Sequence, residues 1–126
     1  MIYDASALLA LVLDETGSEE ALRHLGDGAI SAVNLAEVMS TLAQRGATAD
    51  DLDALLADLP LKVLPFGSDE AKQAALLRPL TLANGLSLGD RACLAVAILQ
   101  DARALSADRA WAALPRDIAD RVDLIR

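Results

Sequence analysis

The fold is decided by a transition that the chain makes within residues 29–46, AISAVNLAEVMSTLAQRG. Ala29–Ser31 is a short apolar run that favours a strand, and helix-forming residues follow it directly from Ala32 to Arg45. Gly46 then supplies the glycine that commonly follows the last turn of a helix. A strand that leads straight into a helix is typical of the β-α-β unit from which parallel sheets are built.

The same alternation of short apolar runs and helical segments continues along the whole chain. Strands are expected at residues 1–3, 29–31, 61–65, 102–105 and 122–125. Helices are expected at residues 6–13, 19–25, 32–45, 49–59, 68–77, 88–100 and 109–114, with a loop at residues 79–85. This order predicts an α/β fold of three layers, in which helices flank a central parallel sheet of four to five short strands.

Composition indicates one domain that spans residues 1–126. Hydrophobic residues make up 54% of the chain, which is too many for a disordered protein, whereas aromatic residues make up only 2%. The only cysteine, Cys93, has no partner for an internal disulfide, which suits a reducing compartment. The apolar stretch Ala5–Leu13 is too short to span a bilayer, and no basic segment precedes it. We therefore expect a cytoplasmic protein without a membrane anchor.

The chain is acidic, with 11 basic and 19 acidic residues and a net charge of −8. This balance argues against broad, sequence-independent binding to nucleic acid, which depends on Lys and Arg that neutralise phosphates. The excess negative charge suits a metal site, solubility or a basic protein partner.

Carboxylates follow the expected strands, where parallel sheets bind their ligands. Asp4 follows the first strand, Glu37 lies on the helix after the second, and Asp108 follows the fourth. Asp90 lies in the first turn of the helix that leads to the fourth strand. Clustered acids raise one another's pKa unless a cation is present, and hard ions such as Mg²⁺ or Mn²⁺ prefer oxygen ligands. Such an ion can activate water for attack on a phosphodiester, so that no nucleophilic side chain is needed.

The candidate acids stand in four sequence blocks, residues 1–6 (MIYDAS), 31–38 (SAVNLAEV), 86–95 (LSLGDRACLA) and 105–111 (LSADRAW). These blocks resemble those of PIN-domain ribonucleases of the VapC toxin type. They occur in the order of that family and span nearly the whole chain. In the last block Ser106 stands where the family commonly has Thr, and the hydroxyl is retained.

The resemblance implies a site and a reaction. The acidic quartet would be catalytic, with Asp4 and Asp90 as direct metal ligands, Asp108 holding the metal or its waters, and Glu37 orienting the attacking water or a second ion. Ser6, Asn34 and Ser106 would hydrogen-bond to these carboxylates and orient them. The implied activity is hydrolysis of RNA to products with a 5′-phosphate and a 3′-hydroxyl. The resemblance also implies a homodimer and a cognate antitoxin whose tail lies across the acidic site, often with an arginine.

Other interpretations of the same residues stay open at this point. Asp4, Asp90 and Asp108 each occupy a position where they could simply cap a helix. A phosphatase that uses Asp4 as nucleophile would need a second Asp two residues later, where Ser6 stands. A non-catalytic module that binds a basic protein, or binds RNA without cutting it, fits the net charge as well as an enzyme does.

Overall fold

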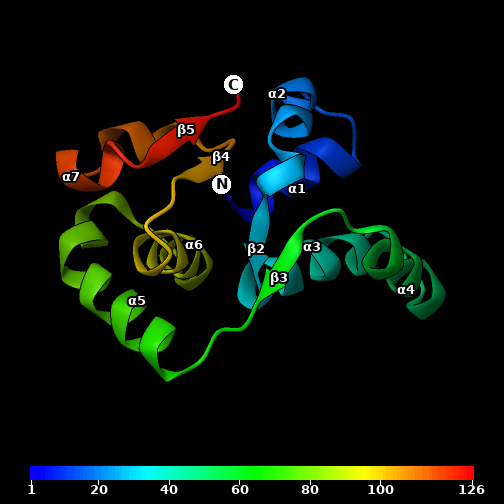
Figure 1. Cartoon of the computed structure of the whole chain (residues 1–126), viewed down its shortest axis with the longest axis horizontal. Coiled ribbons are helices and arrows are strands. Elements are labelled where there is room, and N and C mark those ends of the chain that lie inside the picture. The colour runs from blue at the N-terminus through cyan, green and yellow to red at the C-terminus, as the bar shows by residue number, and fades with distance from the viewer.

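A computed structural model describes residues 1–126 and shows a five-stranded sheet with helices on both faces (Figure 1). The strands are β1 (Ile2–Tyr3), β2 (Ala29–Ser31), β3 (Lys62–Leu64), β4 (Ala104–Ser106) and β5 (Val122–Leu124). All neighbouring pairs are parallel, and the strand order is β3-β2-β1-β4-β5. The predicted three-layer α/β fold with its short parallel strands is confirmed.

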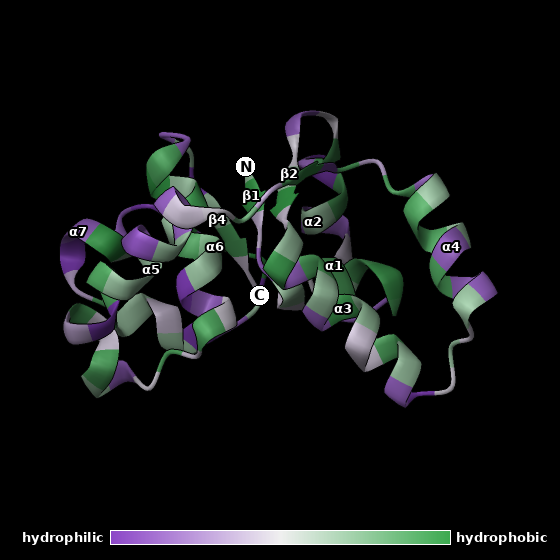
Figure 2. Ribbon diagram, turned by 90° about the horizontal axis from the view of Figure 1, so that it is seen from below, coloured by the Kyte–Doolittle hydropathy of each residue, from purple (hydrophilic) through white to green (hydrophobic).

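The helices form the two outer layers. They are α1 (Ala5–Val12), α2 (Ser18–Arg23), α3 (Ala32–Gln44), α4 (Ala49–Asp58), α5 (Ser68–Thr81), α6 (Leu88–Leu99) and α7 (Arg116–Ala119), with short 3-10 turns at Leu25–Asp27, Leu82–Asn84 and Arg109–Ala113. Figure 2 shows α5, α6 and α7 on one side of the sheet and α1, α2 and α3 on the other, with α4 beyond α3. None of these helices has both the length and the apolar character needed to cross a bilayer.

The core consists of two apolar clusters, one on each face of the sheet. Successive strand residues point to opposite faces, so Ile2 packs with α5 and α6 whereas Tyr3 packs with α1 and α3. Ala104 and Leu105 on β4 divide in the same way. The three central strands are buried throughout and are mainly apolar, whereas the edge strands β3 and β5 are more exposed and carry Lys62 and Asp123.

One edge of the sheet gathers the starts of three helices. Helices α1 and α3 begin directly after β1 and β2, and therefore start at the carboxyl edge of the sheet. Helix α6 leads into the parallel strand β4, so it runs back along the sheet and begins at the same edge. Helices α3 and α6 also pack against each other. The predicted acidic residues are consequently carried to one place.

The loop predicted at residues 79–85 is wrong in its first part, because α5 continues through Pro79 to Thr81. Ala74, Leu77 and Thr81 form a buried stripe at helical spacing, and the Thr81 hydroxyl donates to the Leu77 carbonyl (2.8 Å). Burial of this stripe stabilises the last turn, although Pro79 supplies no backbone N–H.

Candidate functional site

Asp4 lies at the centre of the candidate site as a buried carboxylate, with 4% of its surface exposed. It directly follows β1 and caps α1, where its Oδ2 accepts hydrogen bonds from the hydroxyl (2.6 Å) and the backbone N–H (3.3 Å) of Ser6. This Asx cap fixes the side chain at the carboxyl edge of the sheet.

Two serines connect Asp4 to the end of β4. The Ser106 hydroxyl lies 3.3 Å from Asp4 Oδ2 and 3.2 Å from the Ser6 hydroxyl. Ser6 Oγ also accepts from the backbone N–H of Ala107 (3.0 Å). Each hydroxyl has a single proton, so Ser6 donates to Asp4 while the proton of Ser106 serves either neighbour. The predicted orienting roles of Ser6 and Ser106 fit these contacts.

Asn34 connects three parts of the site and is completely buried. Its Oδ1 accepts from the Ser31 hydroxyl (2.6 Å), so its amide nitrogen faces the acids. That nitrogen lies 2.9 Å from the Gly89 carbonyl, 3.2 Å from Glu37 Oε2 and 3.4 Å from Asp4 Oδ1. Since the amide carries two protons for three acceptors, Asn34 binds the Gly89 carbonyl and shares its other proton between the two carboxylates.

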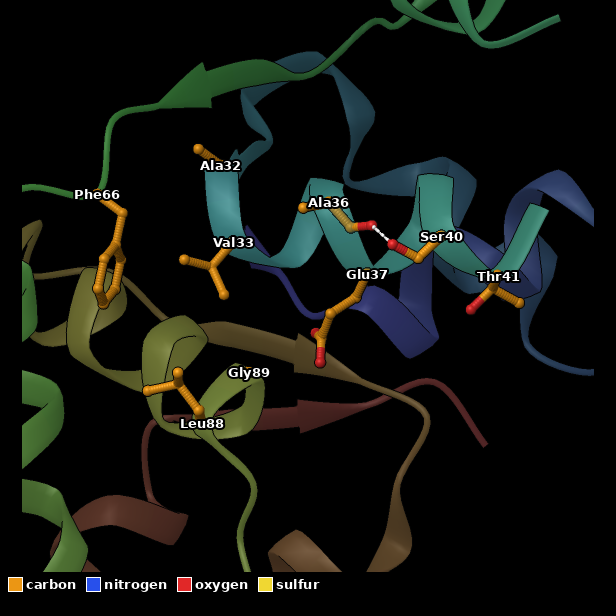
Figure 3. A pocket seen from close by; sticks show the side chains of 9 residues that line it. All are labelled: Ala32, Val33, Ala36, Glu37, Ser40, Thr41, Phe66, Leu88 and Gly89. Atoms are coloured by element: carbon orange, nitrogen blue, oxygen red, sulfur yellow. Dashed lines mark hydrogen bonds between the residues drawn. The ribbon is translucent and has the colours of Figure 1, made fainter. Parts of the chain in front are cut away.

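Glu37 projects from α3 toward the first turn of α6, as Figure 3 shows. Its carboxylate occupies the space in which a side chain at Gly89 would begin, and a Cβ at that position would overlap all three carboxylate atoms. Gly89 is buried, and it is the residue that precedes Asp90. The position of Glu37 therefore requires a glycine at position 89.

Asp90 is held by a capping box at the start of α6. Its Oδ2 accepts from the backbone N–H of Ser87 (2.8 Å), and the Ser87 hydroxyl accepts from the N–H of Asp90 (3.1 Å). The capping position that the sequence allows for Asp90 is thus occupied as a capping box. It uses one carboxylate oxygen of Asp90, so the other oxygen is available to a ligand.

Two of the three acids, Asp4 and Glu37, have raised pKa values. Burial, and then the negative charge of Asp90, raises the pKa of Asp4, while hydrogen bonds from Ser6 partly oppose this rise. Burial and the charges of Asp4 and Asp90 likewise raise the pKa of Glu37. No Lys or Arg forms a salt bridge with any of the three, although three helix N-termini converge here and favour negative charge. The negative charge of the three acids is thus not neutralised by any salt bridge with a Lys or Arg side chain.

Asp108 stands apart from this cluster. Its Oδ1 accepts from the backbone N–H of Ala110 (2.9 Å), so the exposed side chain caps the following 3-10 turn. Its own N–H donates to the Ser106 hydroxyl (3.1 Å), which joins it to Asp4 through one intermediate residue. Its role as a metal ligand stays a prediction.

The donor set of the cluster suits a hard divalent cation. As the side chains stand, no three His, Cys, Asp or Glu groups are close enough together to form a ready-made metal site. Mg²⁺, however, usually keeps several waters and binds through only one or two protein carboxylates. Asp4 and Asp90 supply oxygen ligands of that kind, and a cation beside them would relieve the repulsion that raises the pKa of Asp4.

The sequence identified six of the residues that meet here and placed Ser31 at the same edge of the sheet, whereas Gly89 joins them only in the structure. Ser31 caps α3 and orients Asn34, a role that its position before a helix could have suggested. Gly89 is a glycine in the first turn of a helix, which is unusual enough to mark a close approach.

Several solved structures share this fold. A toxin–antitoxin complex from Klebsiella pneumoniae matches with 20% identity and a TM-score of 0.75, covering 99% of this chain and 97% of that one. DNA-bound VapBC from Salmonella typhimurium matches with 14% identity and a TM-score of 0.76, again covering 99% and 97%. VapBC-5 from Mycobacterium tuberculosis matches with 26% identity and a TM-score of 0.59, covering 99% and 96%.

No protein with a curated description matches the sequence. The model of the PIN domain family, in contrast, matches residues 1–117, which include every residue of the site described above. Sequence and fold agree, and the chain belongs to the PIN domain family.

Proposed function

We propose that this protein is a metal-dependent endoribonuclease and the toxin component of a toxin–antitoxin system. The observation that carries the proposal is the cluster of Asp4, Glu37 and Asp90, three acids without a cationic partner at the ligand-binding edge of a PIN domain. Burial, together with the charge of neighbouring acids, raises the pKa of Asp4 and Glu37, and such a pattern is typical of a site that functions with a bound cation.

Each side chain has a distinct role in the proposed reaction. Asp4 and Asp90 would hold Mg²⁺ or Mn²⁺, with Asp108 binding the ion or its waters. The ion, when bound, would acidify a water and neutralise charge that develops on the phosphodiester. Glu37 accepts the proton of the attacking water, and its raised pKa suits a general base. Water attacks phosphorus, the bond to the 3′-oxygen breaks, and that oxygen takes a proton from solvent water.

Biological features of the proposal rest on the relatives. Structural neighbours include a toxin–antitoxin complex and VapBC assemblies, which supports a cognate antitoxin as partner. The net charge of −8 suits a basic antitoxin segment across the acidic site. We also propose that residues 1–126 form one PIN domain, that the protein is a homodimer, and that it is located in the cytoplasm.

Cleavage of RNA by the purified protein tests it. We expect cutting with Mg²⁺ or Mn²⁺, no cutting with a chelator, and a loss of at least about a hundredfold in Asp4→Asn and Asp90→Asn. Asp51→Asn is the matched control, because Asp51 holds the same capping-box position in α4 and lies far from the site. This control should cut normally.

Two results would contradict the proposal. If both site variants still cut RNA, and circular dichroism shows that both fold, then Asp4 and Asp90 are not the catalytic residues. Metal binding by calorimetry with no cutting of any RNA would instead favour the non-catalytic acidic module.

A further inference from the structure

An apolar pocket of about 780 Å³ opens beside the acidic cluster (Figure 3). Its walls are one side of α3, the start of α6 and the segment that follows β3. The lining includes Val33, Glu37, Phe66, Leu88 and Gly89. This size lies within the range of small-molecule sites.

The pocket and the acidic cluster share Glu37 and Gly89. A substrate whose scissile phosphate lies at the acids therefore has a neighbouring group within reach of the pocket. The lining contains no Lys or Arg, so it cannot neutralise a phosphate, and five of its nine residues are hydrophobic. A neutral, flat group fits this lining better than a charged one.

Phe66 provides an aromatic surface for such a group. Aromatic residues are scarce in this chain, with one Phe, one Tyr and one Trp. Tyr3 and Trp111 are completely buried, whereas Phe66 is only partly buried and faces the pocket beside Leu88 and Val33. Phe66 follows β3 closely, so it lies at the same carboxyl edge of the sheet as the acids.

We propose that this pocket binds a nucleobase of the RNA next to the cleaved phosphate, with Phe66 as the surface on which the base stacks. The inference rests on the proposed ribonuclease function and adds a substrate-binding residue to it. Bases stack on exposed aromatic side chains in most proteins that bind single-stranded RNA, and the contribution is substantial.

A double-mutant cycle between protein and RNA tests the stacking. A short single-stranded RNA with one known cut is prepared with an abasic nucleotide at each position around that cut. We expect one abasic position adjacent to the cut to raise KM about 5- to 150-fold for the wild-type protein, with a smaller change in kcat. Phe66→Ala should raise KM similarly for intact RNA, and should add little when the RNA already lacks that base.

Two further variants separate stacking from packing, because Phe66 also contacts the core. Phe66→Trp keeps an aromatic face and should retain a low KM, whereas Phe66→Leu keeps an apolar side chain and should behave like Phe66→Ala. Normal KM in Phe66→Leu, or additive effects in the cycle, would overturn the inference and leave the nuclease intact. A loss of self-association or antitoxin affinity in Phe66→Ala, with unchanged KM, would overturn it too and make the pocket a protein interface. If the wild-type protein cuts no RNA, the proposed function and this inference fall together.

Discussion

Asp4 is a charged group that the fold buries among hydroxyls, an amide and other acids. Its pKa is raised, so the folded chain holds the Asp4 proton more tightly than the unfolded chain does. The free energy of unfolding therefore decreases as pH rises from the ordinary value of 3.8 through the raised value. Above that range Asp4 destabilises the protein unless a cation is bound.

Asp4→Asn should consequently stabilise the protein at pH 7, because it removes the buried charge, while it abolishes cleavage. Asparagine caps a helix as well as aspartate does, so α1 should keep its start. Thermal unfolding measured from pH 4 to pH 8 checks this, with the exposed Asp53→Asn as control. A variant less stable than wild type at pH 7, in the absence of metal, would contradict the account.

Gly89→Ala should reduce cleavage by about tenfold or more, because the added methyl group would displace the Glu37 carboxylate. Alanine favours a helix over glycine by about 1 kcal/mol, so the variant should not lose stability. Rate measurements on Gly89→Ala, Glu37→Ala and the double variant check the cause. The double variant should be no slower than Glu37→Ala, since no carboxylate remains to be displaced.

At this scale the sequence revealed the acids and their polar neighbours, because each stands in a recognisable block. It did not reveal the need for Gly89, since the group that fills its space comes from Glu37, distant in sequence. It left open whether Asp108 caps the following turn or reaches the acids, and the structure shows that its side chain forms the cap. Such choices depend on three-dimensional neighbours that a local pattern does not contain.

Among the elements, α4 and α6 begin with equivalent capping boxes, at Thr48 and Ser87. Only the second one positions a site residue. Ser87→Ala and Thr48→Ala should each lower the free energy of unfolding by about 1 kcal/mol. Cleavage should fall about threefold to tenfold in Ser87→Ala alone, because the start of α6 carries Asp90. Chemical denaturation and rate measurements on both variants check this, and equal losses of activity would contradict it.

The strands and the long helices could be predicted from the sequence, because periodic apolar residues and caps define them. Two short helical segments could not be predicted in this way. The end of α5 contains Pro79, which predicts a break, yet tertiary packing of Leu77 and Thr81 maintains the helix. Helix α7 has only four residues, too few to show a period, and the burial of Ile118 holds it against the core.

For the whole molecule, the double-sided sheet places Cys93 in the core beneath the site, and its thiol is completely buried. Burial and the nearby acids raise its pKa, so little thiolate forms. Cys93 should therefore not react with a disulfide reagent in the native protein and should react fully in denaturant. Cys93→Ala sets the baseline for this labelling experiment. Rapid stoichiometric labelling of the native protein would show that the layer formed by α5 and α6 opens readily.

The strand order has a consequence for the timing of synthesis. Strand β1 is made first, but it lies at the centre of the sheet, and Asp4 meets Ser106 only after 102 further residues. At about 5–20 residues per second, a ribosome needs roughly 5–20 s to cover that distance. A nascent chain thus lacks β4 and the hydroxyl that holds Asp4 until those 102 residues have been added. The acidic site therefore cannot assemble while the ribosome is still translating the segment between Asp4 and Ser106.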